Sequence, residues 1–126
     1  MNGSFDPQTL QLLDETKEVQ IETRRDEDAP VHRRTIWVVI VDGDVFVRFV
    51  RGEKGRWYRE VSANPNAALQ AGERRIPVRA VPVADELTVG VVSEAYRSKY
   101  GRTSPGSTRA MLQPETLPTT LKLEPA

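Results

Sequence analysis

Two apolar segments joined by a tight-turn dipeptide constrain the fold of this chain more than any other feature. Residues 36–41 (IWVVIV) are apolar on both faces and predict a short, central, buried strand. Asp42-Gly43 follows them and is typical of the two-residue type I′ turn of a β-hairpin. Residues 45–51 (VFVRFVR) supply the second arm. The middle of the chain therefore predicts an antiparallel hairpin.

The second arm of this hairpin carries two arginines although neither of its faces is otherwise polar. Alternation places Arg48 between two apolar residues of one face and Arg51 at the end of the other face. A guanidinium presents planar, paired donors to a phosphate, so we interpret the two arginines as ligands of an anion. The alternative is a structural ion pair across strands, with Glu22 or Glu53 as the partner.

Periodicity and capping signals place further elements on both sides of the hairpin. Helices are predicted at residues 7–15, 56–63 and 85–100, and strands at residues 18–25, 73–83 and 119–124. The prolines within the second of these strands predict an edge or bulged strand. The Pro/Gly/Ser-rich segment 103–114 predicts an ordered surface loop. About five mostly antiparallel strands and three helices make an α+β domain, and closure into a small barrel would remove its exposed edges.

The helix predicted at residues 85–100 carries two alternatives for its packing. Helical spacing places Leu87, Val91 with Val92, Ala95 and Lys99 on one side of the helix, the predicted packing face. Tyr96, Lys99 and Tyr100 could together line a substrate pocket. We favour the simpler arrangement, in which Tyr96 packs inward and Lys99 extends to water.

Composition and charge narrow the classes of function. The 126 residues form one predicted domain, in which residues 1–17 are an N-terminal helix and lead-in. Without cysteine and with one histidine, the chain lacks the residues of thiolate chemistry and of a usual zinc site, and no metal is expected. The single histidine, His32, is interpreted as a surface residue beside a turn. No apolar run is long enough to span a membrane and no secretory signal is recognised, so a cytoplasmic protein is expected.

The distribution of charge favours a small anionic ligand. The net charge is zero, yet residues 1–28 hold eight acids and three bases, whereas residues 31–59 hold seven bases and three acids. A protein that binds nucleic acid usually presents a broad basic surface. Because the positive excess is confined to one stretch, a small anion is favoured as the ligand, and neither nucleic acid nor a membrane is an expected partner.

Residues 33–65 then resemble a known arrangement. The stretch RRTIWVVIVDGDVFVRFVRGEKGRWYREVSANP has a basic strand entry, a DG hairpin and a loop that leads to a short helix ending in Asn-Pro. It resembles the FMN-binding split-barrel superfamily, which includes pyridoxamine-phosphate-oxidase-like proteins and deazaflavin-dependent nitroreductases. With AYRSKYG at residues 95–101 and the closing TTLKLEP, the chain is most similar to a bacterial domain family of unknown function in that superfamily.

The resemblance implies a mainly antiparallel split β-barrel with three flanking helices, and a homodimer with the cofactor at the subunit interface. It also implies FMN or a deazaflavin as the cofactor. By position, seven residues are predicted to bind it: Arg34, Thr35, Arg48, Arg51, Gly52, Trp57 and Tyr58. Core packing or a dimer contact is an equal alternative for the two aromatic residues of this set. A further tryptophan, Trp37, lies in a predicted buried strand and is interpreted as a core residue.

Two functional hypotheses follow from the resemblance. The first is a flavin- or deazaflavin-binding oxidoreductase that transfers a hydride to a small organic acceptor. The second is a non-catalytic dimeric barrel that binds another small anion or serves a structural role. No residue is assigned as catalytic from the sequence, and Tyr58 and Tyr96 are the proton donors to test. The substrate and the reductant are not indicated.

Overall fold

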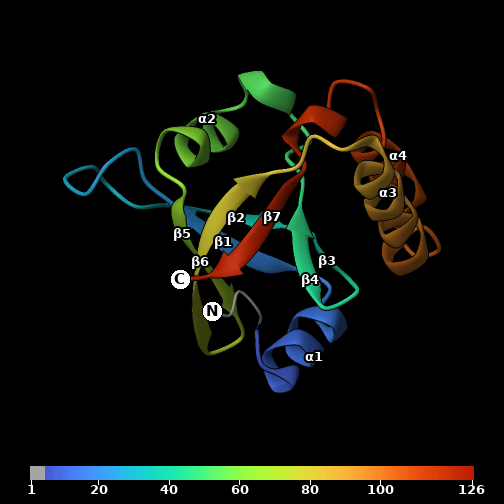
Figure 1. Ribbon diagram of the computed structural model, residues 1–126, viewed down its shortest axis with the longest axis horizontal. Coiled ribbons are helices and arrows are strands. Elements are labelled where there is room, and N and C mark those ends of the chain that lie inside the picture. The colour runs from blue at the N-terminus through green and yellow to red at the C-terminus, as the bar shows by residue number, and fades with distance from the viewer. Residues whose placement is uncertain (1–4) are drawn as a thin grey trace.

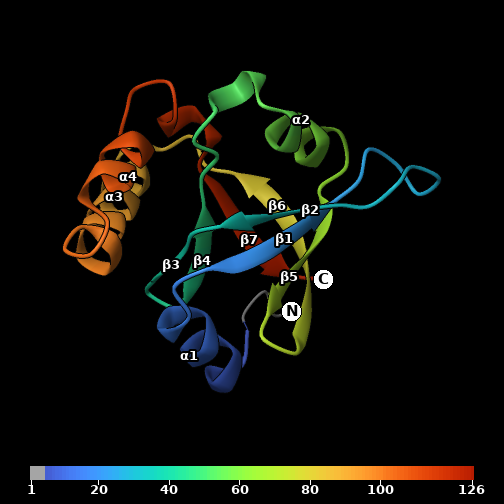
Figure 2. The same ribbon diagram turned by 180° about the vertical axis from the view of Figure 1, so that it is seen from behind.

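A computed structural model describes residues 5–126 as one strongly curled sheet with helices around it (Figure 1). Its elements are, in order, α1 (Pro7–Glu15), β1 (Val19–Thr23), β2 (His32–Ile36), β3 (Val38–Val41), β4 (Asp44–Val47), the 3-10 helix η1 (Gly52–Lys54), α2 (Arg56–Ala63), β5 (Asn66–Ala71), β6 (Arg74–Pro82), α3 (Glu86–Tyr100), α4 (Pro105–Met111), η2 (Leu117–Thr119) and β7 (Leu121–Pro125). Seen from behind, α1 and α2 lie at opposite ends of the curled sheet, while α3 and α4 lie beside it (Figure 2). The fold is an α+β split barrel, as predicted.

The sheet is antiparallel throughout and nearly closes on itself. The strand order is β2-β1-β5-β6-β7-β4-β3, so β2 and β3 lie at its two ends. These end strands are joined in the chain by Trp37 alone. The prediction of one central strand at residues 36–41 is therefore wrong, because the chain bends at Trp37: Ile36 pairs with β1, whereas residues 38–41 pair with β4 at one end of the sheet.

The predicted hairpin turn is confirmed. Asp42 and Gly43 have φ values of 50° and 82°, both positive as a type I′ turn requires. The flanking residues Val41 and Asp44 pair across the two strands. The second arm is shorter than predicted, because β4 ends at Val47.

Two elements were missed and one was misplaced by the sequence patterns. The alanine-rich segment of β5 gave no strand signal, and α4 occupies the segment predicted as a loop. Because the predicted strand at residues 36–41 also divides between β2 and β3, there are seven strands and four α-helices rather than five and three. β6 pairs with both β5 and β7, so it is not an edge strand. It tolerates Pro77 beside the end of β7. The nitrogen and the carbonyl of a strand residue face the same neighbouring strand, and the carbonyl of Pro77 accepts from the backbone N–H of Ala126, just past β7. The missing N–H of Pro77 therefore interrupts no hydrogen bond within the paired part of the two strands.

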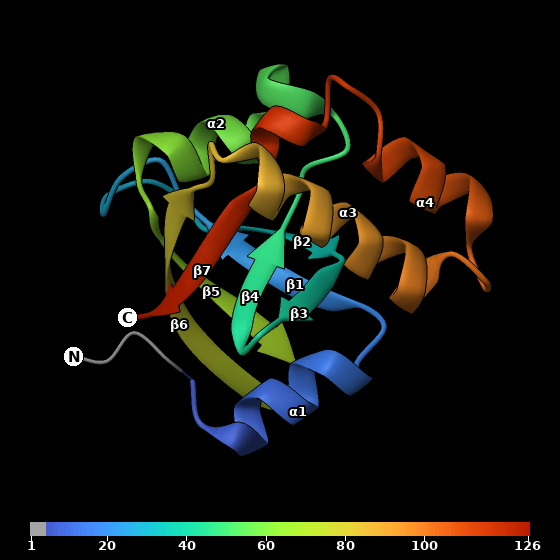
Figure 3. The same cartoon turned by 45° about the vertical axis from the view of Figure 1, so that its right-hand side comes forward.

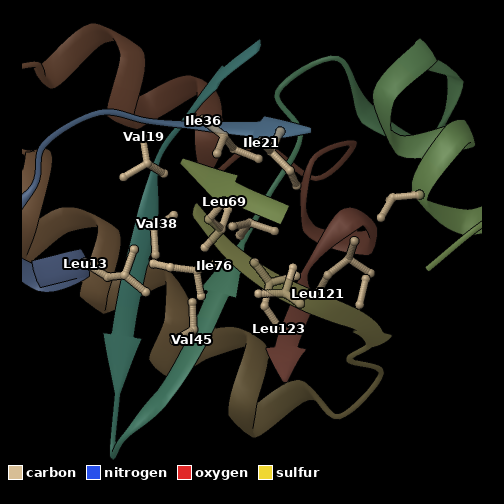
Figure 4. Close-up of a cluster of buried hydrophobic side chains, with 14 of the residues drawn as sticks. Leu13, Val19, Ile21, Ile36, Val38, Val45, Leu69, Ile76, Leu121 and Leu123 are labelled. Carbon is tan, nitrogen blue, oxygen red and sulfur yellow. The ribbon is translucent and has the colours of Figure 1, made fainter. Parts of the chain in front are cut away.

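The barrel interior holds the main hydrophobic core. Side chains from α1 and the strands converge there (Figure 4), among them Leu13, Val19, Ile21, Ile36, Val38, Val45, Leu69, Ile76, Leu121 and Leu123. A second cluster lies outside the barrel, where α3 packs against β3 and α4 lies beside α3 (Figure 3). It consists of Val39, Phe46, Val92, Tyr96, Tyr100 and Met111.

The second cluster corrects the predicted packing face of α3. Val92, Tyr96 and Tyr100 point inward, whereas Leu87 is 81% exposed. The inward position of Tyr96 is confirmed. Lys99 does not extend freely to water, because its Nζ donates to the backbone carbonyls of Leu13 (2.9 Å) and Val38 (2.7 Å).

Candidate functional site

A cavity of about 280 Å³ opens between β2, the segment after β4, and α4. Its polar lining is supplied by Glu18 just before β1, by Arg34 and Thr35 of β2, by Arg48 directly after β4, and by Ser107 of α4. Its apolar lining consists of Ile36, Trp37, Phe49, Val50, Ala110 and Met111. Three of the seven residues predicted to bind a cofactor therefore meet in one cavity.

Arg48 is the most deeply buried charged side chain of this cavity, at 1% exposure. Its Nε donates to the Thr120 hydroxyl (2.8 Å), and its Nη1 donates to the Ser93 hydroxyl (2.9 Å) and the Met111 carbonyl (3.2 Å). Its Nη2 donates to the Val89 carbonyl (2.8 Å). These bonds occupy four of the five N–H groups that a guanidinium carries.

The charge of Arg48 is not neutralised by a carboxylate. No ion pair involves this arginine within residues 5–126, so neither Glu22 nor Glu53 is its partner. Glu22 instead pairs with Arg33 and Arg75, each at 3.4 Å. Burial lowers the pKa of Arg48 from its ordinary value. The cavity wall therefore contains a positive charge whose partners are neutral oxygen atoms.

Arg34, which lines the cavity, and the nearby Arg51, which does not, form a second positive group. Burial lowers the pKa of Arg34, and the nearby positive charge of Arg51 lowers it further. The Arg34 guanidinium lies over the Trp57 ring, 4.6 Å from its centroid. Among the described side chains, no carboxylate pairs with either arginine. Two like charges held together in this way favour a bound anion.

The other three predicted residues lie beside the cavity without lining it. Gly52 is buried at a φ of 75°, where a Cβ would come within 3.0 Å of the Glu115 carbonyl, so glycine is needed there for the fold. Tyr58 packs edge-on against Phe49, with ring centroids 5.9 Å apart. Trp57 supports Arg34, and its indole Nε1 is buried without a hydrogen-bond partner.

Trp37 and α4 are parts of the cavity that the sequence patterns missed. Trp37 lies at the bend between β2 and β3 and stacks on Tyr100, with centroids 3.9 Å apart and the rings parallel within 1°. Tyr96 fixes the same bend, because its hydroxyl donates to the Trp37 carbonyl (2.8 Å). The signal available for α4 was Pro105 at a helical N-terminus, which the surrounding glycine and serine obscured.

Comparison with protein families identifies the chain. Residues 9–123 match the family described as uncharacterized proteins conserved in bacteria (DUF2255). The chain belongs to this family. The predicted resemblance to a bacterial domain family of unknown function is thereby confirmed. No protein with a curated function matches the sequence significantly.

Solved structures of low sequence identity share the fold. An F420-H2-dependent reductase (FDR-A) superposes with a TM-score of 0.66 at 18% identity, over 86% of this chain and 94% of the other. HutZ, the heme storage protein from Vibrio cholerae, gives 0.66 at 17% identity, over 98% and 91%. A putative pyridoxamine 5′-phosphate oxidase from Listeria innocua gives 0.62 at 16% identity, over 94% and 90%. At these identities, the likeness establishes the split barrel and no activity.

No helix within residues 5–126 is long and apolar enough to cross a membrane. Over the same range, no group of three or more histidine, aspartate or glutamate side chains is arranged to hold a metal ion. The first cavity is the candidate site because three of the predicted cofactor-binding residues line it.

Proposed function

We propose that this protein is a flavin- or deazaflavin-binding oxidoreductase-like protein that acts as a homodimer. The observation that carries the proposal is the cavity in which Arg34, Thr35 and Arg48 meet, with Arg51 close to Arg34. Cofactors of this type carry a phosphate in the chain attached to their ring, and arginines that lack carboxylate partners suit that group. The split-barrel likeness to an F420-H2-dependent reductase and to a putative pyridoxamine 5′-phosphate oxidase adds support at the level of the fold.

The residues differ in what each would contribute to the phosphate site. Arg34 and Thr35 line the cavity, and we propose them as the direct phosphate ligands, with Arg51 beside them. Arg48 has one N–H left over after its four protein bonds, so it would contribute chiefly positive charge from within the wall. Its role as a direct ligand stays a prediction. Trp57 would hold the Arg34 guanidinium in place.

The ring of the cofactor would lie toward the apolar part of the cavity. Trp37 is fixed there by stacking on Tyr100, and Val50 and Met111 complete an apolar wall. The cavity volume of about 280 Å³ is just below the lower end of the range for pockets that enclose a whole ligand, about 300 Å³. One subunit therefore fits the phosphate and part of the ring, and a second subunit would cover the remainder.

The bound cofactor would supply the hydride chemistry, with a small organic molecule as the acceptor. This chain would bind the cofactor, orient it and exclude water from one side. Neither tyrosine considered as a proton donor lines the first cavity. Tyr96 is fully buried with its hydroxyl bonded to the Trp37 carbonyl, and Tyr58 packs on Phe49. We therefore assign no catalytic residue.

Cofactor titration tests the proposal. Fluorescence titration of the purified protein with FMN, and separately with F420, should give saturable binding of one of them and a rise in melting temperature. Arg34→Gln should weaken that binding at least tenfold, because a hydrogen bond to a charged group contributes about 1.5–3 kcal/mol. Arg102→Gln, which changes an exposed arginine outside the cavity, is the matched control.

The same titration separates the alternatives. Haemin is included as a third probe, because HutZ shares the fold. If neither FMN nor F420 binds, or if Arg34→Gln binds as tightly as the unaltered protein, the phosphate site proposed here is wrong. The non-catalytic barrel module would then be the better description.

A further inference from the structure

A second and larger cavity, of about 480 Å³, lies where α2 meets the loop between β1 and β2. This loop and α2 lie on the same side of the barrel in both views (Figures 1 and 2). The charged and titratable side chains that line it are Arg25, His32, Arg56, Arg59 and Glu60. It shares no lining residue with the first cavity.

His32 is held in this second cavity by a carboxylate. Its Nδ1 lies 2.8 Å from Oε2 of Glu60, and the Thr23 hydroxyl donates to Oε1 of the same carboxylate, also at 2.8 Å. A carboxylate only accepts hydrogen bonds, so Nδ1 carries the proton and Nε2 is left for another partner. His32 is therefore a partly exposed imidazole that a carboxylate orients in a cavity, a contact that the sequence did not predict.

The arginines give the second cavity a positive excess. Glu60 is the one carboxylate that lines it, and both of its oxygens are engaged by Thr23 and His32. Arg25 also pairs with Asp26 of the loop, at 3.6 Å. Within the described residues, Arg56 and Arg59 pair with no carboxylate. Two guanidinium groups from one turn of α2 thus remain for a ligand.

We propose that this second cavity binds a small phosphate ester, with Arg56 and Arg59 as phosphate ligands and His32 as an oriented hydrogen-bonding group beside them. Three observations carry this proposal together: the cavity, the two arginines without carboxylate partners, and the imidazole held by Glu60. Phosphate suits paired guanidinium groups because their donors match its oxygens. The cavity volume exceeds that needed for the phosphate alone, so an organic portion is expected.

Binding of inorganic phosphate and of glycerol 3-phosphate, measured by isothermal titration calorimetry, tests the site. We expect one saturable site, with the ester binding more tightly than phosphate because it fills more of the cavity. Arg56→Gln and Arg59→Gln should each lower the affinity at least tenfold. Arg102→Gln should leave it unchanged. Malonate is included as a dicarboxylate probe, and tighter binding of malonate than of the ester would overturn the assignment to phosphate.

A variant of the first cavity makes the two sites separable. Arg34→Gln should retain glycerol 3-phosphate binding at the second cavity even where it loses FMN or F420. If glycerol 3-phosphate binding falls in Arg34→Gln and persists in Arg59→Gln, the ester occupies the first cavity and the second site does not exist. Absence of FMN binding would leave this test unaffected.

His32→Asn tests whether the imidazole contributes to binding of the ester. The asparagine amide can still donate to Glu60 from the position of Nδ1, while the group at Nε2 is removed. We expect an unchanged melting temperature and an affinity for glycerol 3-phosphate lowered several-fold. An unchanged affinity would show that His32 and Glu60 only brace the fold.

Discussion

At the scale of single residues, Arg48 joins four separate parts of the chain. Its guanidinium bonds to Val89 and Ser93 of α3, to Met111 at the end of α4, and to Thr120 before β7. A buried arginine normally needs a carboxylate to offset the cost of losing water. Here neutral oxygen atoms offset that cost. The same hydrogen bonds hold α3 and α4 against the barrel beside the candidate cavity.

We expect Arg48→Ala to destabilise the fold strongly. The substitution removes the donor from two carbonyls and two hydroxyls that are partly or fully buried, and each buried group left unsatisfied costs about 1–3 kcal/mol. A loss of about 3 kcal/mol or more in the free energy of unfolding should appear in urea denaturation. Arg48→Lys keeps the positive charge but not the planar pair of donors. Its free energy of unfolding should therefore lie between those of Arg48→Ala and the unaltered protein. Near-normal stability of the alanine variant would contradict the bracing role.

The sequence indicated part of the role of Arg48 and not the rest. An arginine between apolar residues of one strand face is rare enough to indicate a special environment, and that environment exists. Its partners could not be predicted, because Ser93 and Thr120 lie 45 and 72 residues further along the chain. Whether such a residue contacts a ligand or the protein itself depends on contacts that only the fold creates.

At the scale of elements, predictions from local signals succeeded where the local signal was strong. The bounds of α2 and the capped start of α1 at Asp6 agree with the structure, as does the turn at Asp42-Gly43. β5 was missed because alanine has little strand preference, and its place depends on pairing with β1 and β6. The bend at Trp37 was missed because residues 36–41 are an uninterrupted apolar run. Four of the eleven residues that line the cavity lie at that bend or on α4, namely Trp37, Ser107, Ala110 and Met111.

Lys99 links three elements in a way that makes stability depend on pH. Its Nζ joins α3 to the end of α1 and to β3, and burial lowers its pKa from 10.5 to about 8, against an opposing effect of Asp14. Between these values, the unfolded chain binds more protons than the folded one, so stability should rise with pH above about 8. The neutral amine retains two N–H donors for its two carbonyl partners.

Thermal unfolding from pH 7 to pH 10 should show this rise in melting temperature. Lys99→Met should abolish it, because methionine does not titrate. Above pH 10.0, the sign reverses: burial raises the pKa of Tyr96 and Tyr100, so unfolded tyrosine ionises first and stability is lost. A melting temperature that falls steadily from pH 8 would show that Lys99 is not held as described.

At the scale of the whole molecule, the single subunit leaves several large apolar side chains exposed, and one of them lines the first cavity. Val50 lines the cavity and is 42% exposed. Leu87 and Val91 lie one turn apart on the outer face of α3, with exposures of 81% and 41%. Apolar side chains grouped in this way are typical of protein contacts. We infer that this face of α3 contributes to the proposed homodimer.

Sedimentation velocity tests the inference about the dimer. The unaltered protein should sediment as a dimer, and Leu87→Glu should shift it toward the monomer without changing its circular dichroism, because that side chain is exposed. Gln8→Glu adds the same charge to an exposed site on α1 and should leave the dimer intact. If the partner subunit completes the cavity, Leu87→Glu should lower the affinity for the cofactor as it dissociates the dimer. Gln8→Glu should leave that affinity unchanged. A monomer that binds FMN or F420 with full affinity would show that one barrel contains the entire site.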